Sequence, residues 1–298
     1  MNVPHPNPVS SLQVWLNATR PATLLAGLVP VVVGSALAAK DGGFALGPAL
    51  AALVGALLLQ IGCNFANDLF DFINGADDEH RVGPARMTQT GMVTMRQMAC
   101  ATGLAMSGAL FVGLYLVVVA GWPVVVIGLT GILAGIFYTA GPRPLGYLGL
   151  GEVLVFIFFG LAGVGGSYFV QTLTLTYEVM GIAASIGMLS SAILVVNNLR
   201  DRHTDVKVGK NTLAVRFGAT FSRLEYFLLV LLAYVAPIAF GLHSGHLWSL
   251  LVLLSLPLGL LNARDVFQKD SEALNPLLGK TAKLEGLFGL LFSVGVLL

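Results

Sequence analysis

Residues 46–77 read LGPALAALVGALLLQIGCNFANDLFDFINGAD. The first part, 46–67, is an apolar run of the length that a helix needs to cross a bilayer. Four polar side chains follow at the end of the run with the spacing i, i+3, i+4 and i+7: Asn64, Asn67, Asp68 and Asp71. On a continuing helix they share one face. Because carboxylates at such a position are costly unless they are paired, hydrated or bound to a cation, the segment predicts a spanning helix that ends in a polar site.

The rest of the chain has the same apolar character. Of its 298 residues, 56% are hydrophobic and only 10% are charged, and the mean hydropathy is +0.84. A soluble domain carries roughly 25% charged residues, so this composition indicates a polytopic membrane protein with the lipid bilayer as its surroundings. The net charge of +1 offers no basic field for nucleic acid. The two cysteines, Cys63 and Cys100, lack the spacing of a metal or redox site.

Apolar stretches of about 20 residues predict an all-α fold with about nine transmembrane helices in a single domain, 1–298. The expected spans are about 22–39, 46–67, 98–120, 122–140, 150–170, 179–198, 224–242, 246–262 and 283–298.

The distribution of basic residues gives an independent test of this count. With the N-terminus in the cytoplasm, the inner segments together with Lys283 contain 15 of the 16 Lys and Arg residues, and only Lys40 lies outside. Basic residues favour the cytoplasmic side of a membrane. The split supports nine helices with the N-terminus and the polar helix ends on the cytoplasmic side.

A second polar segment, NNLRDRHTDVKVGK, covers residues 197–210. Asn197, Asp201 and Asp205 follow at i, i+4 and i+8, again on one helix face. Hard oxygen ligands of this kind suit Mg²⁺, which prefers a few carboxylates together with substrate phosphate oxygens. Basic residues flank both segments: Arg81, Arg86, Arg200, Arg202, Lys207 and Lys210. The structural alternative, in which the acids only end helices and face water, explains one such segment better than two on the same face.

Together the two segments predict a diphosphate site at the mouth of a hydrophobic chamber. A ligand with a charged head and a long apolar tail fits such a site, and an allylic diphosphate is one. Mg²⁺ stabilises the leaving diphosphate as a Lewis acid. Aromatic faces stabilise the allylic cation, which an electron-rich ring attacks.

These motifs resemble those of the UbiA-type membrane prenyltransferases. The first family motif stands here as Asn67-Asp68-Leu69-Phe70-Asp71, followed by Gly75 and Asp77, and the second as a DxxxD at 201–205. Further similar stretches are WLNATRP (15–21), GPAR (83–86), YTAGPRPLGYLGLGE (138–152) and NNLRDRHTDVKVGKNTLAVRFG (197–218). The third acid comes six residues after Asp71, a spacing typical of the subgroup that prenylates 1,4-dihydroxy-2-naphthoate in menaquinone synthesis.

The resemblance implies nine helices around a central cavity and a set of site residues. The implied Mg²⁺ ligands are Asn67, Asp71, Asp201 and Asp205. The implied catalytic residues are Asp68, Asp77, Tyr138 and Asn198. The implied diphosphate contacts are Arg86, Lys207, Lys210, Arg143 and Asn64. The implied substrates are polyprenyl diphosphate and 1,4-dihydroxy-2-naphthoate, which give demethylmenaquinone, diphosphate and CO₂, and the implied location is a bacterial inner membrane.

Three alternatives stay open on the sequence. The same chemistry could act on another aromatic acceptor, such as 4-hydroxybenzoate, homogentisate or a chlorin, because no motif identifies the acceptor pocket. A secondary transporter would also hold intramembrane acids, although these should cluster near the bilayer midplane. A catalytically silent quinone- or lipid-binding scaffold has no reason to keep both acidic segments.

Overall fold

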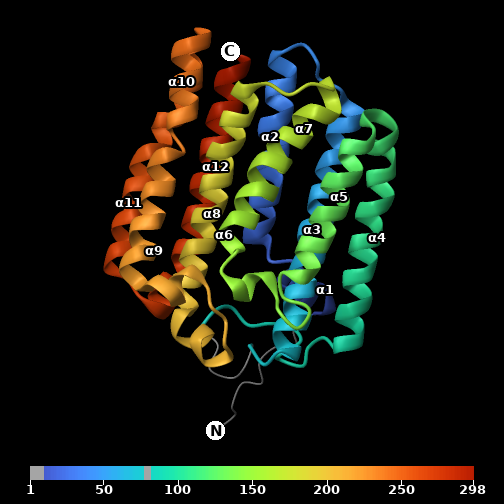
Figure 1. Ribbon diagram of the computed structural model, residues 1–298, viewed down its shortest axis with the longest axis vertical. Helices are drawn as coiled ribbons and strands as arrows, with labels where there is room; N and C mark the ends of the chain where they lie inside the picture. Colours follow the sequence, from blue (N-terminus) through green and yellow to red (C-terminus); the bar gives the residue numbers. More distant parts are fainter. Residues whose placement is uncertain (1–9, 77–81) are drawn as a thin grey trace.

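The computed structural model describes residues 10–76 and 82–298, and these residues are helical throughout apart from the connecting loops (Figure 1). The elements in chain order are α1 (Ser11–Ala18), α2 (Pro21–Lys40), α3 (Leu46–Ile73), α4 (Met95–Ala120), α5 (Trp122–Phe137), η1 (Leu145–Leu148), α6 (Gly151–Val155), η2 (Phe156–Ala162), α7 (Gly163–Thr172), α8 (Tyr177–Asp205), η3 (Val206–Val208), α9 (Leu213–Leu232), α10 (Val235–Ser244), η4 (Leu247–Ser255), α11 (Leu256–Gln268), η5 (Ser271–Leu274) and α12 (Asn275–Leu297).

The predicted all-α membrane fold is confirmed. Seven helical runs in the described part of the chain are long and apolar enough to cross a membrane. The shorter α5 is also apolar, and α12 is a long helix that carries Lys280, Lys283 and Glu285 in its first half. Each of the nine expected spans therefore corresponds to a helix or to a run of consecutive helices.

The predicted boundaries differ where helices continue past their apolar part. Helix α3 continues to Ile73 and α8 to Asp205, because hydropathy alone ends each span at its first polar turn. Both acid-bearing helices therefore carry their polar faces as regular helical turns. Each run then stops at a glycine with a left-handed backbone, Gly75 after α3 and Gly209 after η3, a conformation that costs little only without a Cβ.

Threonine side chains start several of the long helices. Thr94, Thr176 and Thr212 each accept a hydrogen bond from a backbone N–H three residues further on. At α4, Gln97 returns the hydrogen bond to the backbone of Thr94 and completes a capping box. The hydrophobic pattern and these caps explain why the helices begin where they do.

The packed core of the protein lies between α2, α8 and α12 (Figure 1). In the figure α9, α10 and α11 lie on one side of it, and α3, α4 and α5 on the other. Large apolar side chains of the outer helices are exposed, for example Phe111 and Val118 on α4, as expected for a surface that faces lipid. The polar ends of α3 and α8 lie at the same end of the molecule, at the bottom of Figure 1.

Candidate functional site

A cavity of about 630 Å³ opens between α2, α3, α5, α6 and α8. Its polar end is lined by polar residues near the ends of α3 and α8, by the loop that holds Arg86, and by Lys210. Its other end is lined mainly by apolar and small residues such as Leu194, Phe158 and Gly131. The cavity therefore has the two-part character that the sequence predicts for a diphosphate with an apolar tail.

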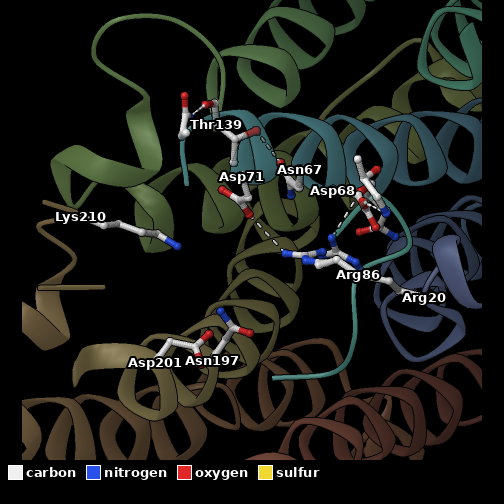
Figure 2. A network of polar contacts seen from close by, with 12 residues as sticks. Arg20, Asn67, Asp68, Asp71, Arg86, Thr139, Asn197, Asp201 and Lys210 are labelled. Carbon is white, nitrogen blue, oxygen red and sulfur yellow. Dashed lines mark hydrogen bonds and ion pairs between the residues drawn. The ribbon is translucent and has the colours of Figure 1, made fainter. Parts of the chain in front are cut away.

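The first polar segment faces this cavity from α3. Asp71 is buried, and its Oδ2 lies 3.2 Å from a guanidinium nitrogen of Arg86. Asn67 also lines the cavity, and its Oδ1 accepts a 3.1 Å hydrogen bond from the Thr139 hydroxyl. Figure 2 shows Asp71 and Arg86 on one side of the cavity, Asn197 and Asp201 on the other, and Lys210 extending between them.

Asp68 is engaged in a different way from Asp71. Its two carboxylate oxygens accept the backbone N–H groups of Met87 and Thr88, each at 2.9 Å. These bonds hold the loop that carries Arg86 against α3, so Asp68 positions a cation that faces the cavity. Asn64 has a similar supporting place, because its amide donates to the Thr19 carbonyl at 2.8 Å and to the Thr23 hydroxyl at 2.9 Å.

The second polar segment is organised around Arg200. This side chain is only 1% exposed and donates hydrogen bonds to both carboxylate oxygens of Asp201. The bond from Nε is 2.7 Å long and the bond from a terminal nitrogen is 2.6 Å long. It also donates to the side-chain oxygens of Asn197 at 2.9 Å and Asn275 at 3.1 Å. Asn275 in turn donates to the carbonyl of Val82 at 3.0 Å, which links α12 to the loop of Arg86. One arginine therefore joins α8, α12 and that loop.

Lys210 brings a positive charge to the middle of the site. Its Nζ lies 3.6 Å from Asp205 and 5.8 Å from the centre of the Tyr147 ring. Burial lowers the pKa of Lys210, but the carboxylates of Asp205 and Asp71 outweigh burial, so its pKa lies above the ordinary value and the ammonium stays charged. Burial, with a further contribution from Asp71, raises the pKa of Tyr147 to about 12, so this phenol stays neutral.

Tyr138 and Asn198 lie at different distances from the cavity. Tyr138 lines it, and Gly151 packs so closely that a Cβ there would lie 2.8 Å from the phenol oxygen. Asn198 lies behind the wall and donates a 2.8 Å hydrogen bond to Glu152. Asn198 therefore supports α8 and α6.

The structure brings together most of the predicted residues. Those that line the cavity are Asn64, Asn67, Asp68, Asp71, Arg86, Tyr138 and Lys210. Asp201 and Asp205 adjoin it through their contacts with Arg200 and Lys210. Arg143 and Lys207 are exposed and lie away from its wall, and Asp77 lies outside the described residues.

Sequence reasoning assigned no role to Arg20 and Glu152, and it named Asn197 only as part of the second polar face. Arg20 and Asn197 line the cavity, and Glu152 lies beneath it, bonded to Asn198. Arg20 stands in the WLNATRP stretch and Glu152 ends the YTAGPRPLGYLGLGE stretch, so the family resemblance offered a signal for both. Asn197 shares a helix face with Asp201 and Asp205, and this spacing was the signal for its place.

The donor set fits a hard divalent cation that substrate oxygens complete. In residues 10–76 and 82–298 no three His, Cys, Asp or Glu side chains come close enough to form a metal cage. The acids instead stand on two sides of the cavity, which suits Mg²⁺ ions held by few protein ligands. The Oδ2 atom of Asp205 is buried and has no hydrogen-bond partner among the described residues, so it is available as a ligand.

The contacts predict different phenotypes for Asp68 and Asp71. In Asp68→Asn the amide nitrogen can no longer accept a backbone N–H, so the loop that carries Arg86 loosens. We expect the KM for the diphosphate substrate to rise about tenfold, which corresponds to the loss of one buried charged hydrogen bond, while the Mg²⁺ concentration for half-maximal activity stays within twofold. Initial rates at varied substrate and varied Mg²⁺ measure both. A large shift in the Mg²⁺ requirement would place Asp68 among the ligands instead.

Comparison with known proteins now adds to this geometry. Residues 27–282 match the UbiA prenyltransferase family. The chain is 40% identical to the 1,4-dihydroxy-2-naphthoate octaprenyltransferase of Escherichia coli strain K12, with 97% of each chain covered. It is 32% identical to the 1,4-dihydroxy-2-naphthoate octaprenyltransferase of Bacillus subtilis strain 168, with 98% of this chain and 95% of that protein covered.

A solved structure shares the fold. The UbiA homolog from Archaeoglobus fulgidus bound to GPP and Mg²⁺ superposes with a TM-score of 0.68 at 16% sequence identity, covering 95% of this chain and 99% of the other. At this identity the likeness shows the fold, while the sequence relatives and the family match show the relationship. The chain therefore belongs to the UbiA prenyltransferase family.

Proposed function

We propose that this protein transfers a polyprenyl group from polyprenyl diphosphate to 1,4-dihydroxy-2-naphthoate in an Mg²⁺-dependent reaction of menaquinone synthesis. The observation that carries the proposal is the cavity with a polar mouth and an apolar interior. The acceptor comes from the relatives named 1,4-dihydroxy-2-naphthoate octaprenyltransferase, two of which are 37–40% identical over nearly the whole chain.

The residues at the mouth of the cavity bind the diphosphate in two ways, through Mg²⁺ and directly. Asn67 and Asp71 would hold one Mg²⁺ ion, and Asp201 and Asp205 a second. The bound ions supply Lewis-acid stabilisation of the leaving diphosphate. Arg86 and Lys210 face the same space and bind the phosphate oxygens directly.

The reaction then needs a polarised C–O bond and a dry, shaped interior. The C–O bond of the allylic diphosphate breaks, and its electron pair leaves with the diphosphate that Arg86 and Lys210 hold. Tyr138 lines the cavity, where its ring face stabilises the allylic cation. The carboxyl-bearing carbon of the acceptor forms the new C–C bond. Loss of CO₂ then returns an electron pair to the ring and gives the reduced form of demethylmenaquinone.

We also propose a bacterial inner membrane with the N-terminus and the site on the cytoplasmic side. The charge distribution supports this orientation, since 15 of the 16 basic residues belong to segments on one side of the nine spans. We propose a single prenyltransferase domain, and the support for it is that α2, α3, α5, α6, α8 and α12 all contribute residues to one cavity wall.

A direct assay tests the function. Purified protein is incubated with 1,4-dihydroxy-2-naphthoate, farnesyl diphosphate and Mg²⁺, and the products are analysed by mass spectrometry. We expect a prenylated, decarboxylated naphthoquinone and free diphosphate, with loss of product in EDTA and recovery on adding Mg²⁺. Product only with 4-hydroxybenzoate or homogentisate would overturn the acceptor. Diphosphate neither bound nor consumed would overturn the enzyme assignment.

A further inference from the structure

A layer with two polar side chains lies within the mainly apolar deep end of the cavity. Ser190 lines it on α8, seven residues before Asn197, and Gln60 lines it on α3, seven residues before Asn67. Seven residues are almost two helical turns, so each deep residue shares a face with its partner at the mouth and lies roughly 10 Å further into the membrane. The apolar and small residues Phe159 and Gly131 lie at the same end.

The molecule is tightly packed beyond this layer, so these residues form the floor of the cavity. Helix α2 packs closely against the start of α7 there. A Cβ on Gly34 would lie 2.5 Å from the carbonyl oxygen of Val164, and one on Gly163 would lie 2.8 Å from the Pro30 ring. Gln60 and Ser190 are therefore the deepest of the α3 and α8 residues that line the cavity.

The Ser190 hydroxyl connects the cavity to a buried acid. It donates a 2.5 Å hydrogen bond to Oε1 of Glu285, which lies on α12 and is fully buried. Oε2 of Glu285 has no hydrogen-bond partner in the described part of the chain. An acid at this depth is costly, so intramembrane acids mark functional sites more often than packing. The steps at the mouth leave Glu285 without a role.

The chemistry of the substrates indicates what this layer binds. The prenyl tail is a hydrocarbon and makes no hydrogen bonds, and the diphosphate is held at the mouth by Arg86 and Lys210. The acceptor is the remaining substrate, and it carries hydroxyl groups at opposite ends of one ring. With its reacting carbon beside the diphosphate, its distal hydroxyl extends inward.

We propose that Ser190, held by Glu285, and Gln60 form the subsite that hydrogen-bonds the distal ring hydroxyl of the aromatic acceptor. This assignment rests on the proposed function and names the residues that select its second substrate. Glu285 acts through Ser190 and is a positioning residue. The amide of Gln60, which also lines the cavity, supplies further hydrogen-bonding capacity at the floor.

The test compares acceptors with and without the distal hydroxyl. The KM for 1,4-dihydroxy-2-naphthoate and the inhibition constant of 1-hydroxy-2-naphthoate are measured in wild type, Ser190→Ala, Glu285→Gln and Gln60→Leu. In the wild type we expect the 4-hydroxyl to improve binding about tenfold, the worth of one buried hydrogen bond. In Ser190→Ala and Gln60→Leu we expect this preference to fall to within twofold of unity, and the KM for farnesyl diphosphate to stay within twofold of wild type.

Two controls separate binding from packing. Ser293→Ala removes another buried serine hydroxyl from α12, away from the cavity lining, and should leave the preference unchanged. The melting temperature of each variant is measured as well. A variant that is only less stable should keep the wild-type preference for the acceptor with the 4-hydroxyl. An unchanged tenfold preference in both Ser190→Ala and Gln60→Leu would overturn the subsite while leaving the proposed function intact. Absence of wild-type product would overturn the function itself.

Discussion

Asp71→Ala should lower turnover by about a thousandfold or more while the protein still inserts and folds. The substitution removes a carboxylate that faces the cavity 3.2 Å from Arg86, at the place where the leaving diphosphate develops its charge. Loss of one preorganised charge-stabilising group costs on the order of 10²–10³ in kcat, and a metal ligand adds its share of the ion's contribution. Steady-state rates at saturating substrate measure the loss.

The Mg²⁺ dependence shows the cause of that loss. A ligand variant needs more Mg²⁺ for half-maximal activity, so Asp71→Asn should partly recover at high Mg²⁺, because its amide oxygen still coordinates weakly. Exposed cations provide matched controls: Arg143→Ala and Lys207→Ala remove charges near the site that lie outside the cavity wall, and should leave turnover within twofold. Normal activity in Asp71→Ala would remove this residue from the metal site.

The fold followed from the sequence because a bilayer leaves few choices. Backbone N–H and C=O groups in hydrocarbon must be hydrogen-bonded within the protein. An apolar run of about 20 residues therefore usually forms a helix. The ends of helices were less predictable for the same reason. The polar turns after 67 and after 198 remain helical at the membrane surface, where hydropathy carries no information about where hydrogen bonding stops.

The sequence predicted which residues share the site better than it predicted what each of them does. Helical periodicity placed Asn67 and Asp71 on one face of α3, and the family resemblance added Lys210, which lines the same cavity. Periodicity does not show which partner a carboxylate binds. It therefore did not distinguish Asp68, which accepts backbone N–H groups of a loop, from Asp71, which faces the cavity beside Arg86. The Ser190–Glu285 pair joins residues 95 positions apart, and no local pattern links them.

Arg200→Met should both unfold the protein at a lower temperature and abolish activity. Its guanidinium makes hydrogen bonds to Asp201, Asn197 and Asn275, and the side chain is 1% exposed. Removing one partner of a buried ion pair leaves a charge without compensation and costs about 3–5 kcal/mol. Thermal unfolding in detergent and the prenyl transfer assay measure the two effects.

The neighbouring arginine gives the matched control for stability. Arg202 pairs with Asp270 at 2.7 Å, but this pair lies at the surface, where Asp270 is 44% exposed. Pairs of this kind contribute about 0–1 kcal/mol. Arg202→Met should therefore change the melting temperature little. An equal drop in both variants would contradict the claim that the buried Arg200 contributes more to stability than the exposed Arg202.

A double variant separates the structural role of this pair from its chemical role. Replacing both partners of a buried ion pair by apolar residues costs less than removing one, because no charge is left without compensation. Arg200→Met with Asp201→Leu should therefore recover much of the melting temperature lost in Arg200→Met alone. Activity should stay absent if Asp201 binds the ion, since no packing restores an oxygen ligand. Recovery of both would show that Asp201 serves only to neutralise Arg200, and the second metal site would then rest on Asp205.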